Sequence, residues 1–353
     1  MASRWFKVIL AASALAFTPV AAAQQDLAIR AGEAWTHGHS GITVPPTLGG
    51  NALTKAKAYA SEELDVSLAF EASDAGEMLT FYVFRNTNGG VPVWFAQAQW
   101  GIEHRGIYGN PALAIGPQAF APPGQASASG LKAVYEARGD AGYRSTGIVL
   151  LPVGEWYVKL RASSKSRSAP ELEAWMDTAL TEIGWPQEIA TATAATPVTD
   201  CARPLNYAKK TKNAPVSLGS LLVNSTLLSA RAQKDESGKA KTPKPVQWCR
   251  DTALGDNRAA YRANGAKDAY LLAVGDNGVG IGIGPDAGAA LLMQGSRTYS
   301  ITLHAADQDV VFAAQDRLPS PQRVLDVVGT GRRSAAVSTW GEEKKIELNS
   351  DAM

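Results

Sequence analysis

The stretch "DAYLLAVGDNGVGIGIGPD", Asp268–Asp286, carries the clearest structural signal in the sequence. Two runs of alternating residues flank Asp276, Asn277 and Gly278, which are residue types that tolerate positive φ angles in tight turns. The pattern predicts two antiparallel strands joined by a turn. Because consecutive side chains of a strand point to opposite faces, we expect the glycines of the second run to share one face.

The glycine pattern of this second strand differs from that of a nucleotide-binding loop. Glycines recur at every second position from Gly278 to Gly284 and alternate with valine and isoleucine. The dinucleotide fingerprint GxGxxG instead joins a strand to a helix. We therefore expect the glycine face to lie close under another backbone or an aromatic ring.

The sequence around this hairpin predicts more antiparallel structure. "TYSITLHA" (298–305) and "DVVFAAQ" (309–315) read as a second strand pair, and two further strands end the chain. Ser320 and Pro321 are favoured residues for the cap and the first position of a short helix. The C-terminal half is predicted to be mainly antiparallel β with this short helix.

The N-terminal half mixes strand and helix patterns. Segments 64–70 and 77–85 predict a hairpin, 91–105 a helix, 130–164 further strands, and 168–185 a second helix. Apolar residues in both helical segments recur at helical spacing. An antiparallel sheet packed on one side by the two helices would bury these residues, which gives an α+β fold class.

This order of hairpin, helix, further strands and final helix resembles that of PsbP-like domains. The resemblance covers Trp35 to Trp185 and concerns the order of the elements. It implies a similar sheet with packed helices. No sequence motif accompanies it, so no residue role is carried over, and a shared fold says little about activity.

The composition of the segment "QEIATATAATPVTD" divides the chain into two units. This segment, residues 187–200, has no aromatic residue and no apolar period, as is typical of a linker. We expect an α+β domain over 30–186 and a β-rich domain over 201–353. The polar segment 233–247 is predicted to be an exposed loop.

The first 23 residues have the features of a signal peptide. Arg4 and Lys7 precede an apolar run, Val8–Val20, and small residues lead to Ala23, the expected cleavage site. The alternative is a membrane anchor, but the apolar run is shorter than the roughly 20 residues of a spanning helix. We expect a mature chain without a transmembrane segment, in the periplasm or secreted.

Export would place the two cysteines, Cys201 and Cys249, in an oxidising compartment. An even number of cysteines in an oxidising compartment usually forms structural bridges. The two are too far apart for a CxxC motif, and neither neighbourhood resembles that of a nucleophilic cysteine. We predict a disulfide between them.

The overall charge argues against two classes of partner. The chain has 45% hydrophobic and 19% charged residues with a formal net charge of +1. A balanced charge does not favour nucleic acid or an anionic membrane surface as partner. The expected partner is an unidentified ligand or a protein of the cell envelope.

The segment "WTHGHSGITVPP", Trp35–Pro46, contains two histidines that could bind a metal. In an extended chain His37 and His39 lie on the same side, about 7 Å apart, which suits two ligands of one zinc ion. Glu33 is the nearest third candidate, and Glu33 or Glu103 could act as base toward a metal-bound water. The alternative is a polar strand with solvated histidines and no cofactor.

Aromatic residues offer another candidate site. Trp94 and Phe95 are adjacent in the predicted helix 91–105 and cannot face the same way. One of them could therefore be exposed and stack on a ligand. Core packing is the favoured interpretation, because the tryptophans lie on predicted buried stripes.

The function favoured by the sequence is a binding or interaction module. We expect an exported, non-enzymatic, two-domain protein of the cell envelope, because no nucleophile, base or complete ligand set is recognisable. One alternative is a metal-dependent hydrolase that uses His37 and His39. Another is an envelope assembly or structural factor that acts through the surface between the two domains.

Overall fold

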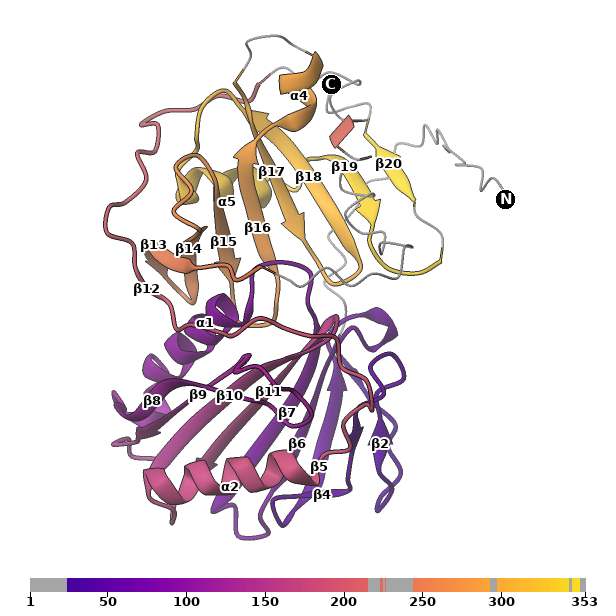
Figure 1. The fold of residues 1–353 in the computed structure, drawn as a ribbon, viewed down its shortest axis with the longest axis vertical. Helices are drawn as coiled ribbons and strands as arrows, with labels where there is room; N and C mark the ends of the chain where they lie inside the picture. The colour runs from indigo at the N-terminus through magenta and orange to yellow at the C-terminus, as the bar shows by residue number, and fades with distance from the viewer. Residues whose placement is uncertain are drawn as a thin grey trace.

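The computed structural model is a mixed α+β protein in which two nine-stranded sheets contain most of the strands. Figure 1 shows the sheets one after the other along the long axis, with helix α1 (Val91–Glu103) between them. The predicted signal peptide and most of the predicted loop 233–247 lie outside the described residues. The structure describes residues 24–214, 223, 224, 226, 244–292, 297–342 and 345–349.

The first sheet is antiparallel and has the strand order β1-β5-β6-β7-β11-β10-β9-β8, with β4 paired to β5. Two short strands, β2 and β3, form a separate pair. The strands are β1 (Gln25–Asp26), β2 (Trp35–Thr36), β3 (Thr43–Val44), β4 (Thr47–Leu48), β5 (Asn51–Ala58), β6 (Asp65–Glu71), β7 (Glu77–Arg85), β8 (Ala112–Phe120), β9 (Gly130–Glu136), β10 (Ser145–Val153) and β11 (Trp156–Ser164).

The predicted hairpin and both predicted helices of this half are confirmed. Strands β6 and β7 pair along their length. Pro92 lies in the first turn of α1, and Ser168 with Glu171 forms a capping box at the start of α2 (Ala169–Glu182). Strands β5 and β8 were not predicted, because one is rich in alanine and lysine and the other contains Gly116 and Pro117.

The expectation that both helices pack on one side of the sheet is wrong. Strand β10 is buried at every position, as a strand covered on both faces must be. Ile148 and Leu150 pack in the cluster that contains the α1 side chains, whereas Val149 and Leu151 pack in the cluster of the α2 side chains. Alternating residues of one strand point to opposite faces, so the two helices cover opposite faces.

The second sheet runs in sequence order from β12 to β20 and is antiparallel except for the β12–β13 pair. Helix α5 packs on one face of it, in the core cluster of Ile301, Val310 and Phe312. The elements are β12 (Thr199–Asp200), β13 (Trp248–Gly255), β14 (Arg258–Ala263), β15 (Tyr270–Val274), β16 (Gly280–Pro285), α4 (Ala287–Leu292), β17 (Tyr299–His304), β18 (Gln308–Gln315), α5 (Pro321–Gly329), β19 (Arg333–Ser338) and β20 (Ile346–Leu348).

Both predicted strand pairs of this half are confirmed. Strands β15 and β16 pair from Tyr270↔Ile283 to Ala273↔Gly280, and β17 pairs with β18. The turn between β15 and β16 is wider than a two-residue hairpin, and its positive φ angles fall on Gly275 (73°) and Gly278 (86°).

The tip of the β15–β16 hairpin is inserted against the first sheet. The carbonyl oxygen of Gly278 accepts a hydrogen bond of 2.8 Å from the side-chain amide of Asn88, which follows β7. The side-chain amide of Gln97 on α1 donates to the carbonyl oxygen of Gly275 at 3.0 Å. Tyr261 and Leu271 of the second sheet belong to the same buried cluster as α1. The two sheets therefore share one hydrophobic core.

A buried lysine of the first sheet holds this tip. Lys159 is 3% exposed, and its ammonium group lies 2.9 Å from the carboxylate and 2.9 Å from the carbonyl oxygen of Asp276. The same nitrogen lies 4.6 Å from the ring centre of Tyr82. Burial opposes ionisation of Asp276, but Lys159 keeps the pKa of this carboxyl below its usual value. The carboxyl of Asp276 is therefore ionised beside the buried lysine.

We predict that Asp276→Asn lowers the free energy of unfolding at pH 7 by about 3 kcal/mol, because it leaves the charge of Lys159 buried without its carboxylate. Urea denaturation measures the loss. The control is Asp256→Asn, whose side chain is 85% exposed beside Arg258, and we expect it to cost less than about 1 kcal/mol. Equal losses in the two variants would contradict the assignment.

Candidate functional site

The two histidines of the N-terminal segment lie side by side, and backbone groups occupy one ring nitrogen of each. The ring centres of His37 and His39 are 5.6 Å apart. His37 is fully buried, with Nε2 3.0 Å from the carbonyl oxygen of Glu63 and Nδ1 2.8 Å from the hydroxyl of Ser40. His39 is exposed, with Nε2 2.8 Å from the carbonyl oxygen of Glu62. Each Nε2 therefore carries a proton and donates it.

The two carbonyl groups belong to a backbone segment in an unfavourable conformation. Glu62 and Glu63 have φ angles of 52° and 56°, in the left-handed region. Such residues are rare outside glycine and asparagine and persist where surrounding contacts hold them. The indole N–H of Trp340, which follows β19, donates to the carboxylate of Glu62 at 2.8 Å. The histidines thus hold a loop that also contacts the second sheet.

A metal at this pair would have to use the remaining ring nitrogens. Nδ1 of His37 is bonded to Ser40, and Glu33 lies in an exposed ion pair with Arg30. Within the described ranges, no three or more His, Cys, Asp or Glu side chains group in a way that could hold a metal ion. Zinc binding by His37 and His39 stays a prediction, which elemental analysis of the purified protein tests.

The adjacent aromatic residues of α1 are both buried. Trp94 is 0% and Phe95 1% exposed. The interpretation of both as core residues is confirmed, because α1 is covered on two sides. The first sheet supplies one side, and residues such as Tyr261 of the second sheet supply the other. Neither residue is available to stack on a ligand.

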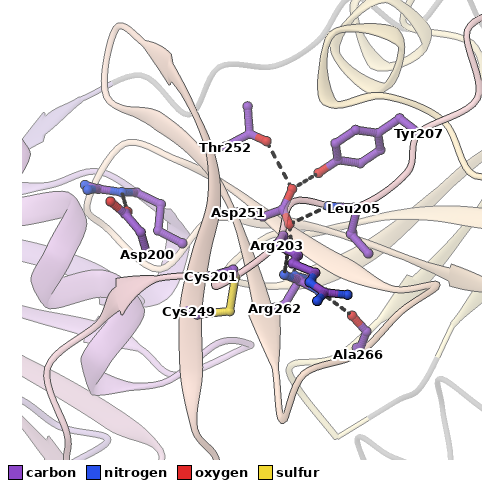
Figure 2. The surroundings of a disulfide bond; sticks show 11 residues. Asp200, Cys201, Arg203, Leu205, Tyr207, Cys249, Asp251, Thr252, Arg262 and Ala266 are labelled. Carbon is purple, nitrogen blue, oxygen red and sulfur yellow. Dashed lines mark hydrogen bonds and ion pairs between the residues drawn. A yellow bond between two sulfur atoms is a disulfide. The ribbon is translucent and has the colours of Figure 1, made fainter.

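The predicted disulfide between Cys201 and Cys249 is present, with a Cα–Cα distance of 4.9 Å. It joins the segment after β12 to β13. Figure 2 shows that the carboxylate of Asp251, two residues beyond Cys249, is the centre of a hydrogen-bonded group. Asp251 has a fully buried side chain and forms an ion pair of 2.9 Å with Arg262.

The groups that surround this carboxylate explain why it is stable inside the protein. The backbone N–H of Leu205 donates to it at 2.9 Å, and the hydroxyls of Tyr207 and Thr252 donate at 2.6 and 3.0 Å. A buried charge with several donors and an opposite charge is well compensated. The disulfide and Asp251 together fasten the chain from 201 to 207 onto the second sheet.

A groove of about 410 Å³ opens on the second sheet, on the face opposite to α5. Its floor is the glycine side of β16, with Gly282 and Gly284. The volume falls within the range of about 300 to 1,000 Å³ that is usual for small-molecule sites. Trp248 of β13 and Leu271 of β15 supply apolar surface on one side.

The other side of the groove is a polar stripe on β17. Ser300, Thr302 and His304 occupy alternate positions, so they share one face. The sheet register places them directly opposite Gly284, Gly282 and Gly280. Small residues on the floor and polar groups on one wall therefore come from two paired strands.

His304 is held in a fixed orientation in this stripe. Its Nδ1 lies 2.7 Å from the carboxylate of Asp309 on β18, and the side chains are 20% and 11% exposed. A methyl group added at Gly282 would lie 2.8 Å from Nε2 of His304, which shows that this nitrogen lies over the glycine floor. The expectation that an aromatic ring covers the glycine face is confirmed at Gly282.

The strand 298–305 is predictable from its sequence, but the role of its polar stripe is not. The sequence does place polar side chains at every second position of this strand, at Ser300, Thr302 and His304. Its meaning depends on the register with β16, because only the pairing Gly282↔Thr302 places these groups beside the glycines. No local pattern fixes that register across the segment between the strands.

Comparison of the chain with protein-family models, with curated proteins and with solved structures finds no match. The site is therefore interpreted from its own geometry. Among the helices that the structure describes, none has both the length and the apolar character needed to cross a membrane.

The burial of His37 predicts a loss of stability on acidification. Burial lowers the pKa of His37 from 6.5 to about 4, although its hydrogen bond to Glu63 opposes the shift. Below pH 6.5 the unfolded chain binds a proton that the folded chain does not bind until pH 4, so stability falls across this window. Asp65 acts in the opposite direction, because burial raises its pKa from 3.8 to about 6.

The variant His37→Gln isolates this contribution. We expect the stability advantage of the wild type over His37→Gln to shrink by about 2 kcal/mol between pH 7 and pH 4.5. Urea denaturation at both pH values measures it, with His39→Gln, at an exposed ring, as the reference. An advantage that stays constant with pH would contradict the burial of a neutral imidazole.

The disulfide is expected to contribute substantially to stability. The bridge closes a loop with a sequence separation of 48 residues, so the double variant Cys201→Ser, Cys249→Ser is predicted to lose about 4 kcal/mol in the chain-entropy model. Denaturation of the wild type under reducing conditions serves as the control and is expected to show the same loss. A loss below about 1 kcal/mol would show that the bridge does not constrain the unfolded chain.

Proposed function

We propose that this protein is an exported, non-enzymatic, two-domain binding protein of the cell envelope, and that its ligand site is the groove on the second sheet. The observation that carries the proposal is the groove itself, with a glycine floor, an apolar side and a polar stripe at Ser300, Thr302 and His304. Concave sites with a few placed polar groups are the usual form of ligand pockets.

The character of the groove supports binding without catalysis. Of the described residues that line it, His304 is the only histidine, and none is Asp, Glu, Lys or Arg. Nucleophilic catalysis by a serine or threonine hydroxyl normally needs a base within hydrogen-bond reach of that hydroxyl. Asp309 orients His304 from beside the groove, and no hydrogen bond joins His304 to a hydroxyl group within the described part of the chain.

Two features support export. The first is the N-terminal sequence, with its basic start, apolar run and small residues before Gln24. The second is the bridge between the two cysteines, which is the form expected in an oxidising compartment. Both point to the periplasm or the extracellular space.

The division into domains over 30–186 and 201–353 is supported by the two separate sheets. The segment 187–200 between them has no regular structure before β12. The resemblance of the first unit to PsbP-like domains remains a proposal about the fold alone. An assembly factor acting through the surface between the units is less well supported, because side chains of both units fill that surface.

The variant Gly284→Leu tests the site. A Cβ at Gly284 meets only Ala269, at 3.5 Å, so leucine is expected to fold normally and to fill the groove. Native mass spectrometry of the mature protein, after incubation with the low-molecular-weight fraction of an envelope extract, is expected to show an adduct on the wild type and none on Gly284→Leu. The control Gly106→Leu, at a position with open space, is expected to retain it.

Two results would overturn the proposal. An adduct that persists in Gly284→Leu would show that the ligand binds elsewhere. The absence of any adduct on the wild type and on Gly106→Leu would remove the groove as a ligand site. Export is tested on the same preparation, since N-terminal sequencing of the protein recovered outside the cytoplasm is expected to begin at Gln24.

A further inference from the structure

We infer that the groove binds a neutral saccharide, with one sugar ring lying flat on the glycine floor of β16 and its hydroxyl edge bonded to Thr302 and His304. This inference rests on the proposed function, because it names the ligand class of the same groove.

The charge of the groove selects for a neutral ligand. No Asp, Glu, Lys or Arg is among the described residues that line it. Charged ligands are bound through charge-assisted hydrogen bonds, typically from arginine or lysine to carboxylate or phosphate. A charged ligand would lose its hydration here without such a partner, which is costly.

The shape of the floor selects for a flat ligand. Neighbouring strands lie about 4.8 Å apart, so β15 and β17 stand about 10 Å apart with β16 between them. The imidazole of His304 lies over Gly282, whereas a Cβ at Gly284 would meet only Ala269, at 3.5 Å, so the floor is open at Gly284. A ring can therefore approach the backbone of β16 closely at Gly284, in a groove whose apolar lining includes Leu271 and Trp248. The apolar C–H surface of a sugar ring suits such a floor.

The free polar groups select for hydroxyls. Within the described part of the chain, the hydroxyl of Thr302 and Nε2 of His304 have no hydrogen-bond partner, although Thr302 is only 7% exposed. Nδ1 of His304 faces Asp309, which leaves Nε2 for a ligand, and a threonine hydroxyl can both donate and accept. Sugar hydroxyls both donate and accept, so they complement both groups.

An aliphatic chain would fit this wall less well. It would cover the hydroxyl of Thr302 and the imidazole nitrogen without bonding to them. Unpaired polar groups of this kind cost about 1 to 3 kcal/mol each. A ligand with an apolar face and a hydroxyl-bearing edge can pack on the glycine floor of β16 and form hydrogen bonds with the polar stripe of β17.

Calorimetric titration of the full mature protein tests the inference. The neutral probes are cellotriose, maltotriose and tri-N-acetylchitotriose, and the comparison probes are trigalacturonate, a neutral heptapeptide and dodecanol. We expect at least one neutral saccharide to bind and the comparison probes not to bind. Thr302→Val, which removes only the hydroxyl, is expected to weaken saccharide binding about tenfold.

Matched glycine variants provide the second measurement. Gly282→Ala places a methyl group 2.8 Å from Nε2 of His304, whereas Gly284→Ala leaves 3.5 Å to Ala269. We expect both to weaken saccharide binding, the first because the methyl group displaces His304 and the second because it occupies the open floor on which the ring lies. Thermal unfolding of each variant identifies any loss of affinity that comes from misfolding, and only folded variants are compared.

The outcomes separate the inference from the proposed function. Failure of all three neutral saccharides, or preference for an acidic, peptide or aliphatic probe, overturns the inference. In that case an adduct that is lost in Gly284→Leu still supports a ligand site in the groove. Saccharide binding that Thr302→Val and Gly282→Ala leave unchanged would place the saccharide elsewhere and overturn the inference as well.

Discussion

The buried ammonium group of Lys159 is the constraint on which the arrangement of the two sheets depends. Lys159 lies in the middle of a sheet face and is 3% exposed, so its ammonium group needs acceptors within the protein. The tip of the β15–β16 hairpin supplies two, the carboxylate and the carbonyl oxygen of Asp276. The β turn of one sheet is thereby fixed against the face of the other. Replacement of the pair by apolar residues could give equal stability, whereas removal of one partner leaves a buried charge uncompensated.

This attachment also determines where the groove lies. The face of the second sheet that meets α1 carries Tyr261 and Leu271 in the shared core. Along β16, from Gly280 to Gly284, the atom nearest to an added Cβ then lies farther away at each successive glycine. A Cβ at Gly280 would lie 2.5 Å from the side chain of Asn88, one at Gly282 would meet His304, and one at Gly284 would meet only Ala269 at 3.5 Å. The same strand thus passes from the interface between the sheets into an open site, and its glycines serve close packing at one end and a flat floor at the other.

The elements that the sequence predicted well are those with a strong local pattern. The hairpins of β6–β7 and β15–β16 and the helix α2 with its Ser168 cap follow from alternation, turn residues and capping. Other local patterns left two interpretations open. Trp94 and Phe95 cannot share a helix face, and exposure of one follows only if the helix has a single buried side. The second sheet buries the other side of α1, so both residues are covered. The sequence of α1 does not predict this contact. The groove was missed for a related reason, since Thr302 and Gly282 are brought together by strand register.

The histidines of "HGH" are best understood through the loop that they hold. Two successive residues with positive φ, Glu62 and Glu63, present their carbonyl groups to the two rings. A neutral imidazole can donate from Nε2 without introducing a charge into the buried segment, which lysine or arginine could not do. The loop then offers the carboxylate of Glu62 to Trp340, beside which Arg85 donates to the carbonyl oxygen of Thr339. These contacts form a second attachment between the sheets. A single attached hairpin tip would still allow rotation about it, whereas two separate attachments fix the orientation of the second sheet and therefore of its groove.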